Sequence, residues 1–455
     1  MRLVFERALL AAGVHYGVAI ELATNGTIRA VGPARPADEG LMIPGLAIPG
    51  MPNLHSHAFQ RAMAGGTETA GTSTDSFWTW RDAMYRFVDR LGPEDVSAIG
   101  AMVYLEMLAA GYTSVAEFHY VHHQPDGMPY VEPTTLSVAV RDAAARAGIR
   151  QVLLPSLYQT AGFGNQAPRA AQRRFVQATD AFLNLYVGLR GQETTRLSTG
   201  IALHSLRAVP HDSLRAVVQG VTAISPTAPI HIHVAEQRQE VEDCLAATGR
   251  RPIAYLLDTG LVDARWCLVH ATHVDAAELV GIVHSRAVVG LCLTTEANLG
   301  DGRFPLDDLL AAGGRFGVGS DSQVSIDPRE ELRLAEYNLR LWREQRVVVR
   351  TERDRHCGTL LYERALAGGS QALGRPAAGL APGADADIVV LDTRLASGAG
   401  VADDALIDQY VFAPRPGIVR DVMVAGEWVL KDRRHALQDI IEHDYIAALA
   451  RLNAR

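Results

Sequence analysis

The chain has 455 residues, 48% of them hydrophobic, and a formal net charge of −8 at pH 7. This acidic balance, with no basic stripe along the sequence, argues against a nucleic-acid partner, and no apolar run reaches the length that crosses a membrane. The first residues lack the features of a signal peptide, so we expect a cytoplasmic protein with one large domain and an appendage, or with two domains.

The middle of the chain alternates short apolar segments with helical patterns. Two helix starts are clear, because Pro93 precedes two acids and Asp327 precedes a proline. Apolar segments predict strands near residues 46–54, 114–118, 150–157, 199–204, 229–235, 266–271, 287–293 and 315–320. Strands alternating with helices in this way predict an α/β fold, a (β/α)8 TIM barrel over residues 46–379.

The two ends of the chain have the pattern of short strands joined by tight turns. Asn25-Gly26 separates two apolar runs, and residues 422–429 have the pattern of a hairpin. We expect residues 1–45 and 380–455 to build one small β-sandwich domain together. The Gly- and Thr-rich segment 64–76 is predicted to be a mobile cover near the functional site.

A His-x-His pair follows the first apolar segment. Leu46-Ala47-Ile48 predicts the buried part of a strand, and strand alternation places His55 and His57 on one face. Two imidazoles side by side at a strand end form half of a metal site.

Further residues of the types that bind metals lie at the ends of later predicted strands. His233 lies at the end of the strand near 229–235, and Asp321 follows the last strand. Three histidines with one aspartate suit a borderline divalent metal such as zinc, with one position left open for water. Glu236 and His270 are then available as proton carriers beside the metal.

Two other histidines compete with these assignments. His231 is expected one layer lower in the barrel than His233. His273 stands close to His270 and is interpreted as a loop residue.

A denser histidine cluster also suggests a metal site. It consists of His119, His122 and His123, which span a strand end and a loop rather than one fixed face. We therefore favour the strand-end ligands over this cluster.

His204 and Arg207 follow the fourth predicted strand. An arginine at the opening of a catalytic barrel usually binds a carboxylate. We therefore expect Arg207 to contact an acidic substrate. The alternative is an ion pair on the surface.

Lysine occurs only once, at Lys431, so nearly all the positive charge is arginine. A Schiff-base lysine, a phosphate-loop lysine or a carbamylated lysine between two metals would have to be this residue. Because Lys431 lies far along the chain from the motifs, these mechanisms are disfavoured, and one metal ion is favoured over two.

With these residues the chain resembles the amidohydrolase superfamily over nearly its whole length. The His-x-His pair, His233, Glu236, His270 and Asp321 match its mononuclear deaminase branch. The tail at residues 380–389 is similar to the return of the chain into that superfamily's composite β-sandwich. A narrower similarity, to the iminohydrolases of histidine breakdown, lies in residues 53–65, 204–209 and 319–328.

The resemblance implies hydrolysis of N-formimino-L-glutamate to N-formyl-L-glutamate and ammonia, by a chain that relatives suggest is a homodimer. It implies one zinc ion per chain, held by His55, His57, His233 and Asp321. It implies that protons and charge are handled by Glu236, His270 and Asp321. It also implies that the substrate, with its two carboxylates, is held by Gln60, Arg81, Tyr120, His204 and Arg207.

Two other functions remain open at this point. A deaminase of a heterocycle, such as guanine or an adenosine derivative, would use the same metal ligands but would favour stacking and amide contacts over two arginines. A non-catalytic binding protein on the same barrel is disfavoured by the full ligand set and by both proton carriers.

Overall fold

The computed structural model describes residues 1–35, 38, 42–69, 76–352, 355–375, 378–395 and 402–454. Residues 70–75 of the expected cover lie outside this described part. In the described part of that segment, Glu68 accepts a hydrogen bond of 2.9 Å from the side-chain amide of Asn298, beyond the seventh barrel strand.

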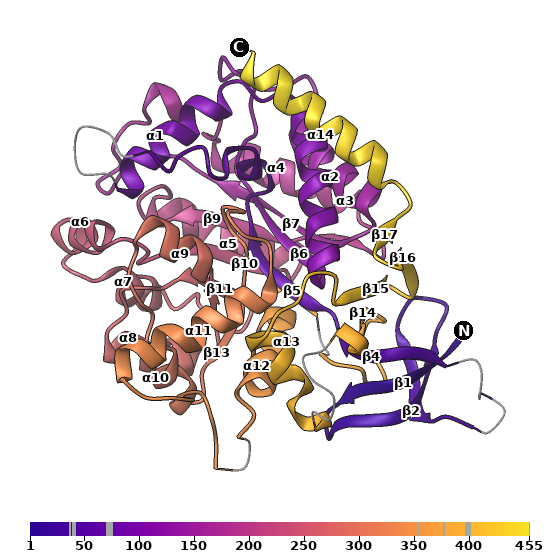
Figure 1. Ribbon diagram of the computed structural model, residues 1–455. Coiled ribbons are helices and arrows are strands. Elements are labelled where there is room, and N and C mark those ends of the chain that lie inside the picture. The colour runs from indigo at the N-terminus through magenta and orange to yellow at the C-terminus, as the bar shows by residue number, and fades with distance from the viewer. Residues whose placement is uncertain are drawn as a thin grey trace.

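A barrel of parallel strands forms the larger part of the molecule, with helices around it (Figure 1). Its hydrogen-bonded strands are β5 (Met51–Ser56), β6 (Tyr112–His119), β7 (Arg150–Leu157), β9 (Ile201–Ser205), β10 (Ile230–Val234), β11 (Trp266–His270), β12 (Val288–Leu291) and β13 (Arg315–Val318). The short β8 (Leu197–Thr199) pairs with β7. Most of these strands are buried along their whole length, which explains their almost continuous apolar sequences. The expected (β/α)8 fold is confirmed.

Two barrel helices begin at Pro93 and Pro328, where the sequence gives the start signals. In the helix that begins at Pro93, the Asp95 carboxylate accepts a 3.1 Å hydrogen bond from the backbone N–H of Gly92, and Gly111 ends the helix with φ of 105°. The helices are α1 (Phe77–Val88), α2 (Pro93–Ala110), α3 (Thr135–Ala147), α4 (Thr179–Arg190), α5 (His211–Ile224), α6 (Arg238–Thr248), α7 (Pro252–Asp258), α8 (Ala276–Ser285), α9 (Leu293–Leu299), α10 (Leu306–Ala311), α11 (Pro328–Arg343) and α12 (Cys357–Ala372). Short 3₁₀ turns occur at Ala58–Met63 and Ala170–Gln172.

The barrel closes between its first and last strands at the level of the metal-ligand motif. Ser56 and Asp321 form a parallel bridge. The backbone N–H of His57 donates to the carbonyl of Asp321 at 3.0 Å, and the N–H of Asp321 donates to the carbonyl of His55 at 3.0 Å. Closure of the sheet therefore fixes the His-x-His pair directly beside Asp321.

A buried network of side chains reinforces this closure. The side-chain amide of Gln323 donates to Ser56 Oγ at 3.0 Å, and Ser320 Oγ donates to the Gln323 carbonyl oxygen at 2.8 Å. Asn53 donates to Ser320 Oγ at 2.6 Å. The network joins the first strand to the loop after the last strand in a region with little regular backbone pairing.

Replacing Gln323 by leucine is expected to lower the thermal midpoint of the protein. The change removes one hydrogen bond from each of the buried Ser56 and Ser320 hydroxyls, which keep their bonds to Glu117 and Asn53, at a cost of about 0.5–1.5 kcal/mol for each lost bond. Scanning calorimetry can compare it with Gln345→Leu, which alters the same side-chain type at an exposed position. Equal midpoints for the two variants would contradict a stabilising role for the network.

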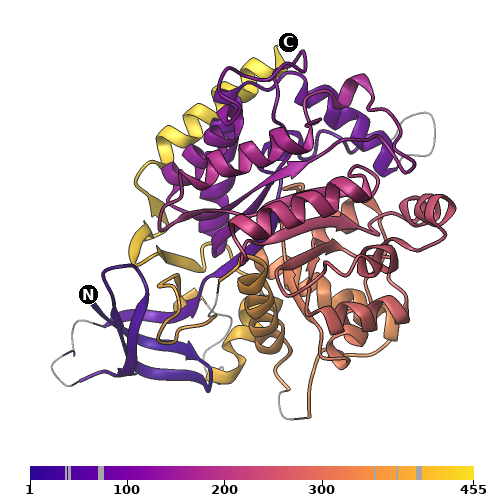
Figure 2. The same ribbon diagram turned by 180° about the vertical axis from the view of Figure 1, so that it is seen from behind.

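Both ends of the chain contribute to a second, separate sheet, seen beside the barrel in Figures 1 and 2. Its strands are β1 (Arg2–Leu10), β2 (Gly13–Leu22), β3 (Ile28–Pro33), β4 (Ile43–Pro49), β14 (Ile388–Leu391), β15 (Val419–Val424), β16 (Glu427–Lys431) and β17 (Arg434–His435). They form one hydrogen-bonded sheet, in the order β17-β16-β15-β14-β4-β1-β2-β3, whose apolar side chains enclose a small core of their own.

The first apolar segment does not run straight into the barrel as expected. Leu46-Ala47-Ile48 belongs to β4, which pairs with β1 and β14 of the small sheet. The barrel begins only at β5, after Gly50. A Cβ atom at Gly50 would lie 2.1 Å from Cγ2 of Thr113, so glycine is needed where the chain passes from one sheet to the other.

The C-terminal part of the chain also contains helices, in addition to the strands that it contributes to the small sheet. Besides short 3₁₀ turns at Thr393–Leu395 and Asp403–Ala405, it contains α13 (Leu406–Phe412) and α14 (Gln438–Asn453). Helix α14 runs along α2 on the outside of the barrel (Figure 1), where Arg451 pairs with Asp95 at 2.9 Å. Among the described helices, none combines the length and apolar character of a bilayer-crossing segment.

Candidate active site

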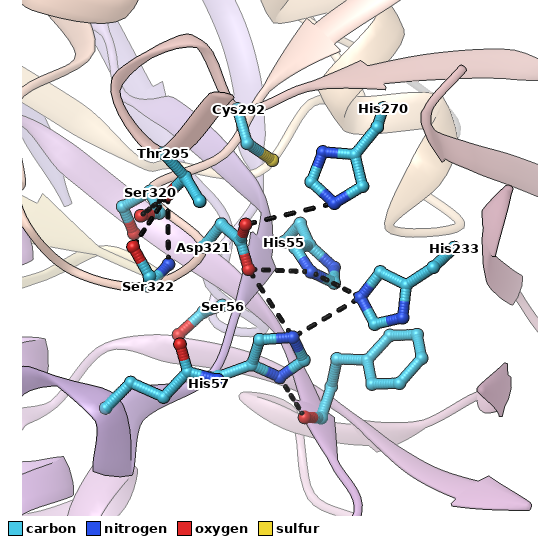
Figure 3. Close-up of polar contacts among 12 residues, drawn as sticks. His55, Ser56, His57, His233, His270, Cys292, Thr295, Ser320, Asp321 and Ser322 are labelled. Atoms are coloured by element: carbon cyan, nitrogen blue, oxygen red, sulfur yellow. Dashed lines mark hydrogen bonds and ion pairs between the residues drawn. The ribbon is translucent and has the colours of Figure 1, made fainter. Parts of the chain in front are cut away.

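The predicted metal-ligand residues meet at the carboxyl ends of the barrel strands. His55 lies on β5, His57 directly follows it, His233 lies on β10 and Asp321 follows β13. Figure 3 shows the three imidazole rings and the Asp321 carboxylate directed toward one another. All four side chains are buried, with residue exposures between 0% and 6%.

Four of the distances between these ligand atoms are those expected around one metal ion. His233 Nε2 lies 3.1 Å from His55 Nε2 and 3.3 Å from His57 Nε2. Asp321 Oδ1 lies 3.2 Å from His55 Nε2 and 3.4 Å from His57 Nε2. A tetrahedral zinc site with bonds of about 2.0–2.1 Å separates its ligand atoms by about 3.3–3.4 Å. The three histidines lie close enough to share one divalent ion, and Asp321 lies at the same range from two of them.

Hydrogen bonds on the far side of the rings set the tautomers that a metal needs. His57 Nδ1 lies 2.8 Å from the carbonyl oxygen of Phe118, and His233 Nδ1 lies 2.9 Å from that of His204. A carbonyl can only accept, so both Nδ1 atoms carry hydrogen and both Nε2 lone pairs face the centre. Two such lone pairs at 3.3 Å cannot hydrogen-bond to each other, and a shared cation resolves the conflict.

Burial keeps these histidines neutral and therefore able to bind a metal. It lowers the pKa of His55 to about 3, and it lowers the pKa of His57 and His233 as well. Burial alone would raise the pKa of Asp321, but the neighbouring histidines hold it well below its usual range. The cluster consists of three neutral imidazoles and one carboxylate, the protonation states in which these groups can bind a metal.

Glu236 and His270 lie beside the ligand cluster. His270 Nε2 is 3.8 Å from Glu236 Oε1 and 3.9 Å from Asp321 Oδ2, and its Nδ1 is 3.2 Å from Glu296 Oε1. Burial raises the pKa of Glu236 to about 7. Burial would lower the pKa of His270, but the surrounding carboxylates raise it to about 10. The two groups can hold and transfer protons next to the ligand cluster.

A cavity at the barrel mouth brings together the residues expected to hold a substrate. Its lining includes Gln60, Arg81, Tyr120, His204 and Arg207, together with His57, His233, Glu236, His270 and Asp321. The side-chain amide of Gln60 donates to the Tyr120 hydroxyl at 3.0 Å. Phe77, Trp80 and Phe175 add apolar walls.

The two arginines of this cavity are buried and form no ion pair with another described residue. Arg81 is 7% exposed and Arg207 is 8% exposed. Burial would lower the pKa of Arg207, but the nearby carboxylates of Glu240 and Glu236 raise it. The Nε atom of each guanidinium is buried without a hydrogen-bond partner. Burying a charge is costly unless it is paired, so the site is built for a ligand that supplies negative charge.

The competing histidines have structural roles. His231 Nε2 lies 2.8 Å from the carbonyl oxygen of Ala372, below the site, as expected. His122 and His123 lie 2.9 Å from backbone carbonyl oxygens, and within the described ranges neither they nor His119 gather with other ligand atoms. His273 does not line the cavity that contains His270.

The sequence prediction missed several buried acids near the site, among them Glu117, Glu296 and Asp301, the last of which groups with Glu236 and His270. Glu117 accepts hydrogen bonds of 2.6 Å from Ser56 Oγ and 2.8 Å from the N–H of Ala58, so it supports the chain on both sides of His57. Glu296 Oε1 lies 3.2 Å from His270 Nδ1 and so holds the imidazole ring from that side. An acid within the apolar segment 114–118 was a usable signal for Glu117, whereas nothing in the sequence placed Glu296 against His270.

Comparisons with known proteins agree with this fold and site. Residues 46–429 match the amidohydrolase family. The chain is 49% identical over 448 residues to the formimidoylglutamate deiminase of Pseudomonas aeruginosa, covering 98% of each chain. It is 27% identical over 392 residues to the 5-methylthioadenosine/S-adenosylhomocysteine deaminase of Haloarcula marismortui, covering 86% of this chain and 82% of that one.

Solved structures show the same architecture. An amidohydrolase from Brucella melitensis superposes with a TM-score of 0.91 at 42% identity, covering 99% of each chain. A zinc-bound adenosine deaminase from Xanthomonas campestris superposes with a TM-score of 0.83 at 21% identity, covering 100% of this chain and 98% of that one, which shows the shared fold. The chain belongs to the amidohydrolase family.

Proposed function

We propose that the chain hydrolyses N-formimino-L-glutamate to N-formyl-L-glutamate and ammonia, a step of histidine breakdown. The observation that carries the proposal is the pair of buried, unpaired arginines beside a set of metal ligands, which suits a substrate with two carboxylates. The Pseudomonas aeruginosa relative, 49% identical over 98% of both chains, supports the same assignment. The chain is thus a hydrolase that acts on a carbon–nitrogen bond.

The proposed cofactor is one zinc ion per chain, held by His55, His57, His233 and Asp321. Their spacing and neutral tautomers support this ligand set. When bound, such an ion makes a water molecule acidic enough to lose its proton near pH 7.

Three side chains would then move protons and stabilise charge. Asp321 directs Oδ1 toward His55 and His57, which leaves Oδ2 on the His270 side to accept the proton of the attacking water. Glu236, with its pKa raised to about 7 by burial, can deliver a proton to the departing nitrogen, so that ammonia leaves as a neutral molecule. The protonated His270 ring stabilises negative charge that develops between these two carboxyl groups.

The substrate would be held at its other end by charge-assisted hydrogen bonds. Arg207 and Arg81 are the proposed partners of the two carboxylates, because a guanidinium binds a carboxylate through two parallel bonds. Gln60 and Tyr120, already hydrogen-bonded to each other, and His204 complete the proposed contacts.

Ammonia release across a small panel tests the substrate assignment. We expect turnover of N-formimino-L-glutamate and little turnover of guanine, adenosine or S-adenosylhomocysteine. A deaminase of a heterocycle is the second candidate, because relatives with that activity in their names match at 27% identity. Higher kcat/KM for any heterocycle of the panel would favour that candidate.

Replacing Arg207 by methionine is expected to raise KM and to lower kcat/KM by at least about 30-fold. A carboxylate left unpaired in a partly desolvated site costs roughly 2–5 kcal/mol. Zinc content should stay unchanged, because Arg207 touches no ligand atom. The exposed Arg434, in β17 of the small sheet, offers a control in Arg434→Met. An unchanged kcat/KM in Arg207→Met would contradict the carboxylate contact.

The cytoplasmic location and the homodimer expected from the sequence remain predictions. Cell fractionation tests the location, and light scattering of the purified protein tests the assembly.

A further inference from the structure

The indole ring of Trp78 contacts both buried arginines. The guanidinium carbon of Arg81 is 4.5 Å from the ring centroid and that of Arg207 is 5.7 Å from it. Trp78 and Arg81 are three residues apart on α1 and therefore share one helix face, whereas Arg207 comes from the loop after β9. Tyr85, four residues beyond Arg81, contacts the same guanidinium at 5.5 Å.

The two arginines also separate two cavities. Arg81 and Arg207 line both the catalytic cavity and a larger outer cavity, and they are the residues that the two linings share. Trp78 lines only the outer cavity. It therefore supports the arginines from the side opposite to the ligand cluster and does not reach the reacting atoms.

The outer cavity offers the arginines an alternative partner. Its lining includes the carboxylates of Asp82 and Asp243. Burial lowers the pKa of Arg81. Tyr85 raises this pKa and the nearby positive charge of Arg207 lowers it, so that the net change is a lowering. Two like charges in a confined space gain by moving apart, and an outward turn of either guanidinium would bring it toward these acids. The indole lines the same outer cavity and offers an aromatic face to both cations, so it competes with these acids for the guanidinium groups.

We propose that Trp78 is a positioning residue that keeps Arg81 and Arg207 unpaired and directed into the catalytic cavity, and so gives the enzyme its selectivity for dicarboxylates. The proposal rests on the proposed function, since it concerns the carboxylate end of that substrate. Trp78 is not a catalytic residue, so its loss should weaken substrate binding while the chemical step is largely kept.

The test compares Trp78→Leu and Trp78→Phe with the wild-type protein. We expect Trp78→Leu to raise KM for N-formimino-L-glutamate by about tenfold or more with kcat changed less than about threefold, and Trp78→Phe to recover much of the affinity because it keeps an aromatic face. Trp342→Leu is the matched control, because Trp342 stacks with Arg303 at 4.3 Å on the exposed face of α11. An unchanged KM in Trp78→Leu, or a loss confined to kcat, would overturn the proposal.

A double-mutant cycle shows whether Trp78 acts through the arginines. In an Arg81→Met background, Trp78→Leu should add much less to KM than it does in the wild-type background. An equal additional effect in both backgrounds would show that Trp78 acts independently and would overturn the proposal.

Binding of glutarate, a simple dicarboxylate, separates this proposal from the proposed function. Calorimetry should show weaker glutarate binding in Trp78→Leu than in the wild-type protein, with unchanged binding in Trp342→Leu. If the wild-type protein releases no ammonia from N-formimino-L-glutamate, the proposed reaction fails, and glutarate binding still tests the role of Trp78. Equal glutarate affinity in wild type and Trp78→Leu would overturn the role of Trp78 alone.

Discussion

Replacing His233 by alanine is expected to abolish both metal binding and hydrolysis. Its Nε2 lies within 3.3 Å of the Nε2 atoms of both His55 and His57, so it completes one face of the ligand set. Losing a hydrogen bond behind a ligand typically costs 10–100-fold in metal affinity, and losing the ligand itself should cost more. Elemental analysis and ammonia release measure the two effects on the same preparation.

His231 provides the matched control for this variant. It lies on the same strand, two residues earlier, and its Nε2 bonds to the backbone of Ala372 rather than to the cluster. His231→Gln should therefore retain metal. A His233→Ala protein that keeps one tightly bound ion per chain would show that the ligand assignment is wrong.

Metal removal tests the number of ions. A chelator should abolish activity, and one equivalent of zinc per chain should restore it, because the ligand atoms fit one ion and the single lysine, Lys431, lies in the small sheet. A requirement for two equivalents would argue for a second ion.

Replacing Glu236 by glutamine is expected to lower kcat by about 10²–10⁴-fold while metal is retained. The variant keeps the size of the side chain but removes the basic carboxylate, and proton transfer by a positioned side chain contributes an effect of this order. The buried Glu236 lines the cavity within 3.8 Å of His270, so it can reach a departing nitrogen there.

Glu242→Gln serves as the control for this variant. It makes the same chemical change on the exposed side of α6, a few residues away. Near-normal turnover in a metal-loaded Glu236→Gln protein would remove Glu236 from the proton transfer.

The clustering of the proposed metal ligands could be predicted because they stand at the ends of apolar strands, and parallel strands bring their carboxyl ends to one edge. The sheet to which a strand belongs was less predictable. Leu46-Ala47-Ile48 has the apolar character of a barrel strand, but it pairs with β1 and β14, and local patterns carry no information about a partner hundreds of residues away.

The substrate side of the site depended on tertiary structure in the same way. Arg207 follows a strand and could be placed at the barrel mouth from the sequence. Arg81 could be placed there only through a resemblance, because it lies on α1, and no sequence pattern states that this helix covers the mouth. The contact of Trp78 with both arginines likewise exists only in the folded chain.

The products of the metal-loaded protein acting on N-formimino-L-glutamate test the central claim most directly. Proton NMR with a parallel ammonia assay distinguishes cleavage at the imine nitrogen from cleavage at the amino-acid nitrogen. The proposed arrangement, with Glu236 serving the departing imine nitrogen and the arginines holding the glutamate end, predicts N-formyl-L-glutamate and one equivalent of ammonia. Formation of L-glutamate and formamide, or no turnover with zinc bound, would contradict it.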